Sequence, residues 1–168
     1  MKKSWPVFIV LSLTVISLLM PFPIRGPQAS PLANLAHAPT FAILVFVVLV
    51  TISRANMSGS VSCKSETSLM FSMGWRWVLA VAFTLSLFGI GLEFAQRHFG
   101  RNGAWSDVLL NTLGLAAGIC LFGAHCSRQR AISRWQSLTL GLAGWCLLLA
   151  ASTQPVYELW LIYRGNSH

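Results

Sequence analysis

Two of the four acidic side chains in this 168-residue chain lie on either side of one short polar turn. Glu93 lies near the end of one apolar run, and Asp107 begins the next. Gln96 follows Glu93 by three residues and Asn111 follows Asp107 by four, so each amide shares a helix face with its carboxylate. Such side chains can orient a charged ligand, accept hydrogen bonds or move a proton. Their spacing marks all four as candidate ligand-binding residues.

His37 and Arg101 extend this set. Arg101 lies in the turn itself, where its guanidinium can pair with either carboxylate or contact an anionic ligand. His37 can act as a general base, and with Glu93 and Asp107 it completes the candidate catalytic residues. No activated nucleophile is identifiable beside them, so the sequence leaves open whether the protein is an enzyme.

A purely structural interpretation of the same residues also stands. An ion pair between Arg101 and a carboxylate can pin two helices together and bind nothing. Asp107, which follows Ser106, suits a helix amino terminus, where an acidic side chain caps the helix and complements its dipole. Glu93 ends its helix, where a negative charge opposes the dipole. The placement of Glu93 therefore favours a functional role, whereas Asp107 fits both interpretations equally.

Helices in a membrane are the elements that must position these residues. Apolar residues make up 55% of the chain and charged residues 10%, against roughly 25% charged residues in a soluble domain. The net charge of +8 is compatible with nucleic acid. The basic residues, however, lie in the caps and loops between apolar runs, and no nucleic-acid-binding module accompanies them. The composition predicts lipid as the solvent and no nucleic-acid partner.

Five apolar runs are long enough to cross a bilayer as helices. They span residues 5–24, 35–53, 74–96, 107–124 and 135–152. The predicted fold class is therefore all-α, a polytopic transmembrane helix bundle with about five spanning helices. The Pro- and Gly-rich residues 25–36 are expected to form a loop. The first run is interpreted as an uncleaved helix, although a cleaved signal peptide has a similar pattern.

Three regions follow from these spans. Residues 1–34 contain the first helix and an outer loop, and residues 35–125 form a core with helices two to four. Residues 126–168 contain a basic loop, the fifth helix and a tail. Aromatic residues in that tail, after residue 154, suit a position at the membrane interface.

Basic residues indicate which way the bundle faces. With a cytoplasmic amino terminus, eight of the 12 Lys and Arg residues fall inside and the other four outside. In this orientation His37, Glu93 and Asp107 lie just beneath the outer surface on three different helices. Ionisable residues at such a depth are costly unless they are paired or face water, which indicates a functional site. The sequence thus predicts one outward-facing polar pocket.

Gly114 and Gly118 form a G-x-x-x-G pattern, which lets another helix approach closely. Internal packing against the helix of residues 74–96, or its Gly89 and Gly91, is the favoured interpretation. Oligomerisation through Gly114 and Gly118 is the alternative.

The sequence gives little support for a metal or cofactor site. The four cysteines show no C-x-x-C spacing, which argues against a zinc or thiol-redox site. A metal site combining His37, His98, Glu93 and Asp107 is geometrically conceivable. No P-loop or dinucleotide fingerprint occurs. We therefore expect neither a metal nor a cofactor.

The order of the polar residues resembles the signature of the VanZ-like membrane protein family. Three motifs match in order: Glu93-x-x-Gln96, Gly100-Arg101 and Asp107-x-x-x-Asn111-x-x-Gly114-x-x-x-Gly118. His37 followed by Phe41 looks like the family's upstream histidine segment, and the resemblance covers residues 34–122. It implies a multi-pass protein of the cell envelope in the bacterial inner (plasma) membrane. The family is named for a member linked to antibiotic resistance against the lipoglycopeptide teicoplanin.

The leading hypothesis is that the pocket binds membrane lipids or lipid-linked cell-wall intermediates at the outer leaflet. Arg101 would contact an anionic group, and Glu93 and Asp107 would orient the ligand. Gln96 and Asn111 would supply neutral hydrogen bonds. The first alternative is a membrane-embedded hydrolase or transferase that uses the same pocket. The second is a structural or partner-binding membrane protein whose contact surface is the G-x-x-x-G pattern.

Overall fold

The computed structural model describes residues 29–57, 75–98, 105–129 and 134–165, together with Ile9 and Ser12. The four ranges are α-helices: α2 (Ala29–Met57), α4 (Trp75–His98), α5 (Trp105–Gln129) and α6 (Arg134–Gly165). Each is long and apolar enough to cross a membrane, where the helix satisfies its own backbone hydrogen bonds. The predicted all-helical membrane fold is confirmed. The rest of the first predicted span, residues 5–24, lies outside the described part of the chain.

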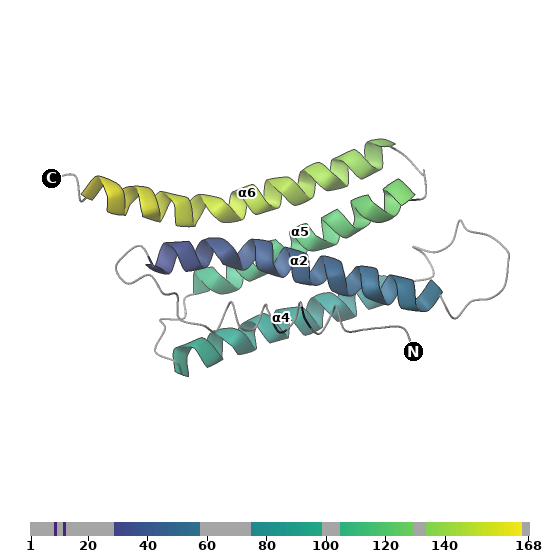
Figure 1. Cartoon of the computed structure of the whole chain (residues 1–168), viewed down its shortest axis with the longest axis horizontal. Coiled ribbons are helices and arrows are strands. Elements are labelled where there is room, and N and C mark those ends of the chain that lie inside the picture. The colour runs from purple at the N-terminus through teal and green to yellow at the C-terminus, as the bar shows by residue number, and fades with distance from the viewer. Residues whose placement is uncertain are drawn as a thin grey trace.

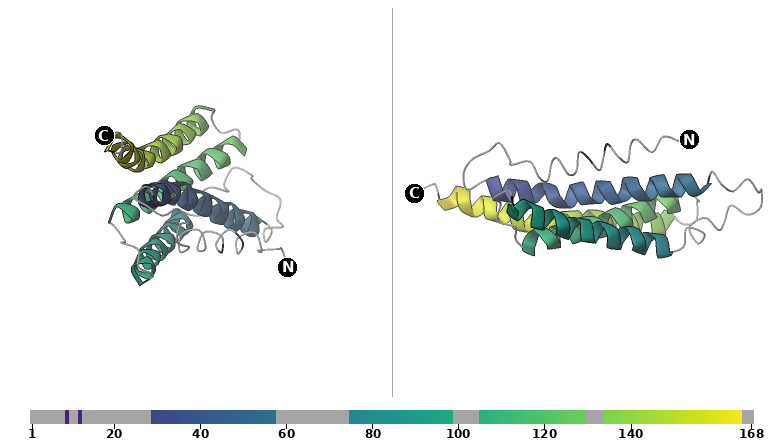
Figure 2. Two further views of the ribbon diagram at one scale, coloured as in Figure 1. Left: turned by 60° about the vertical axis from the view of Figure 1, so that its left-hand side comes forward. Right: turned by 90° about the horizontal axis from the view of Figure 1, so that it is seen from below.

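α2 and α5 lie side by side in the middle of the bundle, with α4 packed on one side of the pair and α6 on the other (Figures 1 and 2). α2 and α5 run in the same direction, while α4 and α6 run in the opposite one (Figure 1). The beginnings of α2 and α5 therefore lie at the same end of the bundle as the ends of α4 and α6. This arrangement brings together polar residues that are far apart in the chain.

The charged side chains that the structure describes divide between the two ends of the bundle. At the end where α2 and α5 begin, which we call the acidic end, lie Glu93, Asp107, Glu158 and Arg164. At the opposite end, which we call the basic end, lie Arg54, Arg76, Arg128 and Arg134. Membrane proteins carry excess Lys and Arg on the cytoplasmic side. This division agrees with a cytoplasmic basic end, although the sidedness itself stays a prediction.

Two helices are longer than the sequence predicts. α2 begins at Ala29, inside the predicted loop of residues 25–36. Pro31 does not prevent this start, because it lies in the first turn, where a missing N–H breaks no helical bond. α6 continues past residue 152 to Gly165, with Pro155 buried inside it. Proline bends a helix by removing one bond, and α6 is curved (Figure 1). Ending the helix there would expose more unbonded backbone groups to lipid, which costs more than the bend.

The apolar core lies where α2, α4 and α5 meet. Leu44 and Leu49 of α2 are completely buried against Leu85 of α4 and against Leu115 and Phe122 of α5. α6 contributes much less, because most of its large apolar side chains are exposed. In a bilayer those side chains contact lipid, so they need no protein partner.

Gly114 and Gly118 bring the backbones of α2 and α5 together. A Cβ atom at Gly114 would lie 2.8 Å from the Cα of Ala38, and one at Gly118 would lie 2.6 Å from the carbonyl oxygen of Ala42. The glycines therefore pack inside the chain, but their partner is α2. The prediction that they pack against the helix of residues 74–96 is wrong, and a Cβ at Gly91 on that helix would meet nothing within 4 Å. The alanines of α2 have the same four-residue spacing as the glycines. Oligomerisation through the glycines stays a prediction.

Candidate functional site

Four polar side chains from three helices are buried near the acidic end, and we call them the polar cluster. His37 lies two turns into α2, Glu93 lies in the last turns of α4, and Asp107 and Asn111 lie in the first turns of α5. The exposed fractions of these residues are 1%, 4%, 5% and 6%, in that order. Both carboxylate oxygens of Glu93 are buried. The cluster thus combines an imidazole, an amide and two carboxylates within the protein interior.

A hydrogen bond joins α2 to α5 inside the polar cluster. His37 Nδ1 lies 3.0 Å from Asn111 Oδ1. Because an amide oxygen can only accept, Nδ1 is the donor. In the neutral ring Nε2 then carries the lone pair. The bond therefore fixes both the orientation of the ring and its tautomer.

Helix register places Glu93 on the side of α4 that faces His37 and Asn111. A Cβ at Gly89 would lie 3.1 Å from the ring of Phe41 and 3.5 Å from Asn111 Nδ2, so this face of α4 points toward α2 and α5. Glu93 shares a helix face with Gly89, and His37 shares one with Phe41, because residues four apart lie one turn apart. Since the helices run in opposite directions, both turns lead toward the acidic end. Glu93 and His37 therefore lie at the same level on facing helices.

Asp107 lies one turn closer to the acidic end than Asn111. It belongs to the first turn of α5, which begins at Trp105. Ser106 Oγ donates a hydrogen bond to Asp107 Oδ1 at 3.4 Å. A carboxylate in this turn is stabilised by the helix dipole, typically by about 0.3–1 kcal/mol. This geometry fits a structural role for Asp107, which is nevertheless a member of the polar cluster.

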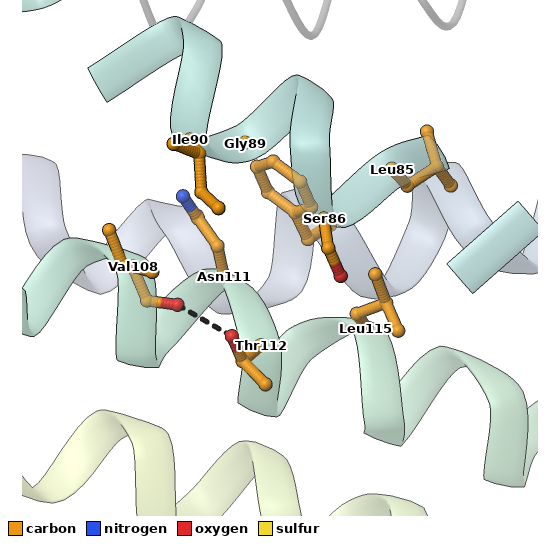
Figure 3. Close-up of a pocket in the computed structure, with 9 residues that line it drawn as sticks. Leu85, Ser86, Gly89, Ile90, Val108, Asn111, Thr112 and Leu115 are labelled. Carbon is orange, nitrogen blue, oxygen red and sulfur yellow. Dashed lines mark hydrogen bonds between the residues drawn. The ribbon is translucent and has the colours of Figure 1, made fainter. Parts of the chain in front are cut away.

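A small cavity lies beside Asn111, between α4 and α5 (Figure 3). Its volume is about 30 Å³, and its polar lining comes from Ser86, Asn111 and Thr112. The Thr112 hydroxyl donates to the Val108 carbonyl at 2.8 Å. A water molecule needs about 10–15 Å³ of such space. The cavity therefore has room for one or two waters and is too small for a lipid headgroup.

The structure adds two residues to the predicted site and does not describe the side chains of two others. Arg101 and the side chain of Gln96 lie outside the described residues. Ser86 and Gly89 were not predicted as parts of the site. Their signals in the sequence are a hydroxyl inside the apolar run of α4 and a glycine one turn before Glu93.

Metal ligands do not gather in the part of the chain that the structure describes. No three His, Cys, Asp or Glu side chains of this part could hold a metal ion. Instead, the Nδ1 atom of His37 is bonded to an amide oxygen. The alternative metal site also required His98, whose side chain lies outside the described residues.

The VanZ/LLP1 family model matches residues 3–125 of the chain. The matched region contains α2, α4 and α5 up to His125, and with them the whole polar cluster. α6 lies beyond it. No curated protein and no solved structure matches the chain.

Proposed function

Because the chain belongs to the VanZ/LLP1 family, we propose a function for the polar cluster that lies within the matched region. The cluster recognises the polar headgroup of a membrane lipid or of a lipid-linked cell-wall intermediate. In this proposal the family's link to glycopeptide (teicoplanin) resistance reflects binding of such an intermediate.

The burial of Glu93 is the observation that carries the proposal. A carboxylate within a membrane helix is expensive and by default indicates a functional site. Glu93 is 4% exposed, and it lies near the carboxyl end of α4, where its charge opposes the helix dipole. Stability alone does not favour this placement. A ligand that offers hydrogen-bond donors or a positive charge would stabilise the carboxylate further.

The composition of the cluster selects the class of headgroup. Two carboxylates and a ring nitrogen accept hydrogen bonds, so they suit hydroxyls, amides and ammonium groups. Arg101, which lies between α4 and α5 in the sequence, would contact a phosphate. A polyprenyl-pyrophosphate that carries an amino sugar and a short peptide offers both kinds of group. The cavity beside Asn111 would supply only water, so the headgroup must bind at the acidic end itself.

The proposed location is the outer leaflet of the bacterial inner membrane. The arginines of the basic end support a cytoplasmic position for that end. The acidic end then faces outward, where the sugar and peptide parts of lipid-linked intermediates are used. With five spans, the amino terminus lies in the cytoplasm.

Binding to reconstituted protein tests the proposal. The probe is a fluorescent polyprenyl-pyrophosphate disaccharide-pentapeptide, titrated into vesicles that contain the protein. Glu93→Gln keeps the size of the side chain and removes its charge. Since a hydrogen bond to a charged group contributes about 1.5–3 kcal/mol, the affinity should fall about 10- to 150-fold. Arg101→Gln should weaken binding of the same probe.

Glu158→Gln is the matched control. Glu158 also lies at the acidic end, but on α6, where Gln154 Nε2 donates to it at 3.2 Å. This variant should bind the probe like the unmodified protein. Unchanged binding in folded Glu93→Gln and Arg101→Gln proteins would reject the proposal. An equal loss in Glu158→Gln would reject it too, because the effect would then be one of general charge.

The bond between His37 and Asn111 favours a second candidate, a hydrolase or transferase that uses the same cluster. An imidazole whose Nδ1 is held by an acceptor presents Nε2 as a general base, as in other oriented histidines. The substrate would be the phosphate or acyl bond of the same lipid. His37→Gln protein that binds the probe normally but forms no product would support catalysis. Full turnover in His37→Gln and Glu93→Gln would exclude it.

A further inference from the structure

A wide groove lies between α2 and α6, with α5 as its floor. Its volume is about 1340 Å³, larger than the roughly 300–1,000 Å³ of pockets for drug-sized ligands. α6 and α2 meet near the acidic end, where Ala38 and Ala151 share a buried cluster with Leu110. Toward the basic end the two helices diverge (Figure 1). The groove is therefore widest away from the polar cluster.

The wall formed by α6 is a single apolar stripe. Leu138, Leu142, Trp145 and Leu149 recur every three or four residues along it, and all four are exposed. Residues at this spacing lie on one helix face. The lining of α6 extends from Arg134 to residue 152, which is about 27 Å at 1.5 Å per residue. One leaflet of the hydrocarbon core is about 15 Å deep. The stripe is therefore long enough to cover a complete acyl chain.

The opposite wall and the floor continue this surface. Ile43 and Phe46 of α2 and Leu121 of α5 line the groove. The Ser137 hydroxyl donates to the Ala124 carbonyl of α5 at 3.1 Å, which ties α6 to the floor. The groove is thus a formed feature of three packed helices rather than a gap between independent ones.

Positive charge marks the end of the groove at the basic end. Arg128 in the last turn of α5 and Arg134 in the first turn of α6 both line it, and both side chains are exposed. No acidic residue is found among the described residues of the lining. The three described carboxylates, Glu93, Asp107 and Glu158, lie at the acidic end. An occupant that matches this surface is anionic at the basic end and apolar beyond it.

We propose that this groove holds an anionic phospholipid from the leaflet at the basic end. Its phosphate contacts Arg128 and Arg134, and one acyl chain lies along the leucines of α6. Arginines at a membrane surface follow the general charge bias of membrane proteins. What distinguishes these two is that they border the same continuous groove as the apolar stripe. The proposal is independent of the polar cluster, which lies at the other end of the bundle.

α6 supplies one wall of the groove from outside the region that the family model matches. The family model ends at residue 125, so both the stripe and Arg134 lie beyond the matched region. Only α2 and α5 contribute groove residues from within it. The groove thus combines residues of the matched region with residues that follow it.

Lipid binding to delipidated protein in a neutral detergent tests the inference. The probes are phosphatidylglycerol and phosphatidylcholine with the same acyl chains, and bound lipid is counted by native mass spectrometry. Each arginine near an anionic lipid contributes about fivefold in affinity. The phosphatidylglycerol affinity of the Arg128→Gln/Arg134→Gln protein should therefore fall about 25-fold, and phosphatidylcholine affinity should not change. Arg54→Gln/Arg76→Gln is the matched control, because these arginines lie at the same end but outside the groove.

A second variant tests the apolar part of the groove. Gly141 lines the groove, and a Cβ there would meet only Ala124 Cβ, at 3.9 Å. Gly141→Phe should therefore fold and fill the space of the acyl chain, so that phosphatidylglycerol binding is lost although both arginines remain. Thermal unfolding confirms that each variant is folded.

Three results would overturn the inference. The first is equal affinity for phosphatidylglycerol and phosphatidylcholine in the unmodified protein. The second is an equal loss in the control variant, which would reduce the effect to surface charge. The third is a dimer that Gly141→Phe dissociates and that excludes lipid, which would make a second copy of the chain the occupant.

Discussion

Gly114→Ala should weaken the bundle by forcing α2 and α5 apart. The new Cβ would lie 2.8 Å from Ala38 Cα and 2.9 Å from its carbonyl carbon. Both are backbone atoms, so no side-chain rotation can relieve the contact. Overpacking of this kind costs about 1–3 kcal/mol. His37 is the neighbour of Ala38, so the same displacement should lengthen its 3.0 Å bond to Asn111.

Gly91→Ala is the control that separates the overpacking cost of Gly114→Ala from the change in helix propensity. Gly→Ala inside a helix also gains about 1 kcal/mol of helix propensity, which partly hides the effect of the contact. Gly91→Ala in α4 has the same gain, but its Cβ would meet nothing within 4 Å. The propensity therefore cancels between the two variants. Gly114→Ala should be less stable than Gly91→Ala by about 1–3 kcal/mol.

Equilibrium unfolding of the purified protein in mixed micelles measures this difference. Ala38→Gly should not restore Gly114→Ala, because the atoms in contact belong to the backbone of residue 38 and not to its methyl group. Equal stability of Gly114→Ala and Gly91→Ala would refute the close approach of α2 and α5. Rescue by Ala38→Gly would show that the contact is made by the side chain.

Three further predictions concern other parts of the bundle. Asn111→Ala removes the acceptor of His37 Nδ1, and the free energy of unfolding should fall by about 1–3 kcal/mol; a change below about 0.5 kcal/mol would contradict a buried bond. Ser137→Ala removes the hydroxyl bond between α6 and α5 and should cost only about 1 kcal/mol in the same measurement. Cys146 is exposed and Cys126 is buried, so a thiol reagent should modify Cys146 first in detergent-solubilised protein. Peptide mass spectrometry measures the two rates, and equal rates would contradict the described packing.

The sequence predicts the membrane helices well because lipid imposes a simple constraint. A helix that crosses a bilayer needs about 20 apolar residues, and that pattern is visible without knowing what the helix contacts. The ends of the helices are harder to predict. Pro31 and Pro155 look like breaks in the sequence, but the first lies in an initial turn and the second inside α6. Whether a proline ends a helix depends on what surrounds it.

The position of the polar residues along the bundle axis was predictable from the sequence, whereas the residues that they contact were not. Counting residues along each helix places His37, Glu93 and Asn111 near the same end. The pairing of His37 with Asn111 depends on which helices are neighbours, and the sequence favoured the wrong neighbour for Gly114 and Gly118. The alanine spacing of α2 was the missing signal. Small residues reveal that a helix is approached closely, but one helix alone does not reveal which partner approaches it.

The parallel arrangement of α2 and α5 has a consequence for biosynthesis. His37 and Asn111 are 74 residues apart, and a ribosome adds about 5–20 residues per second. The histidine therefore emerges from the ribosome about 4–15 s before its amide partner does. During that interval α2 must enter the bilayer with its imidazole hydrated, or wait at the translocon until α4 and α5 follow. Nascent chains halted before residue 111 should accordingly hold α2 in a looser, protease-accessible state than chains halted beyond α5.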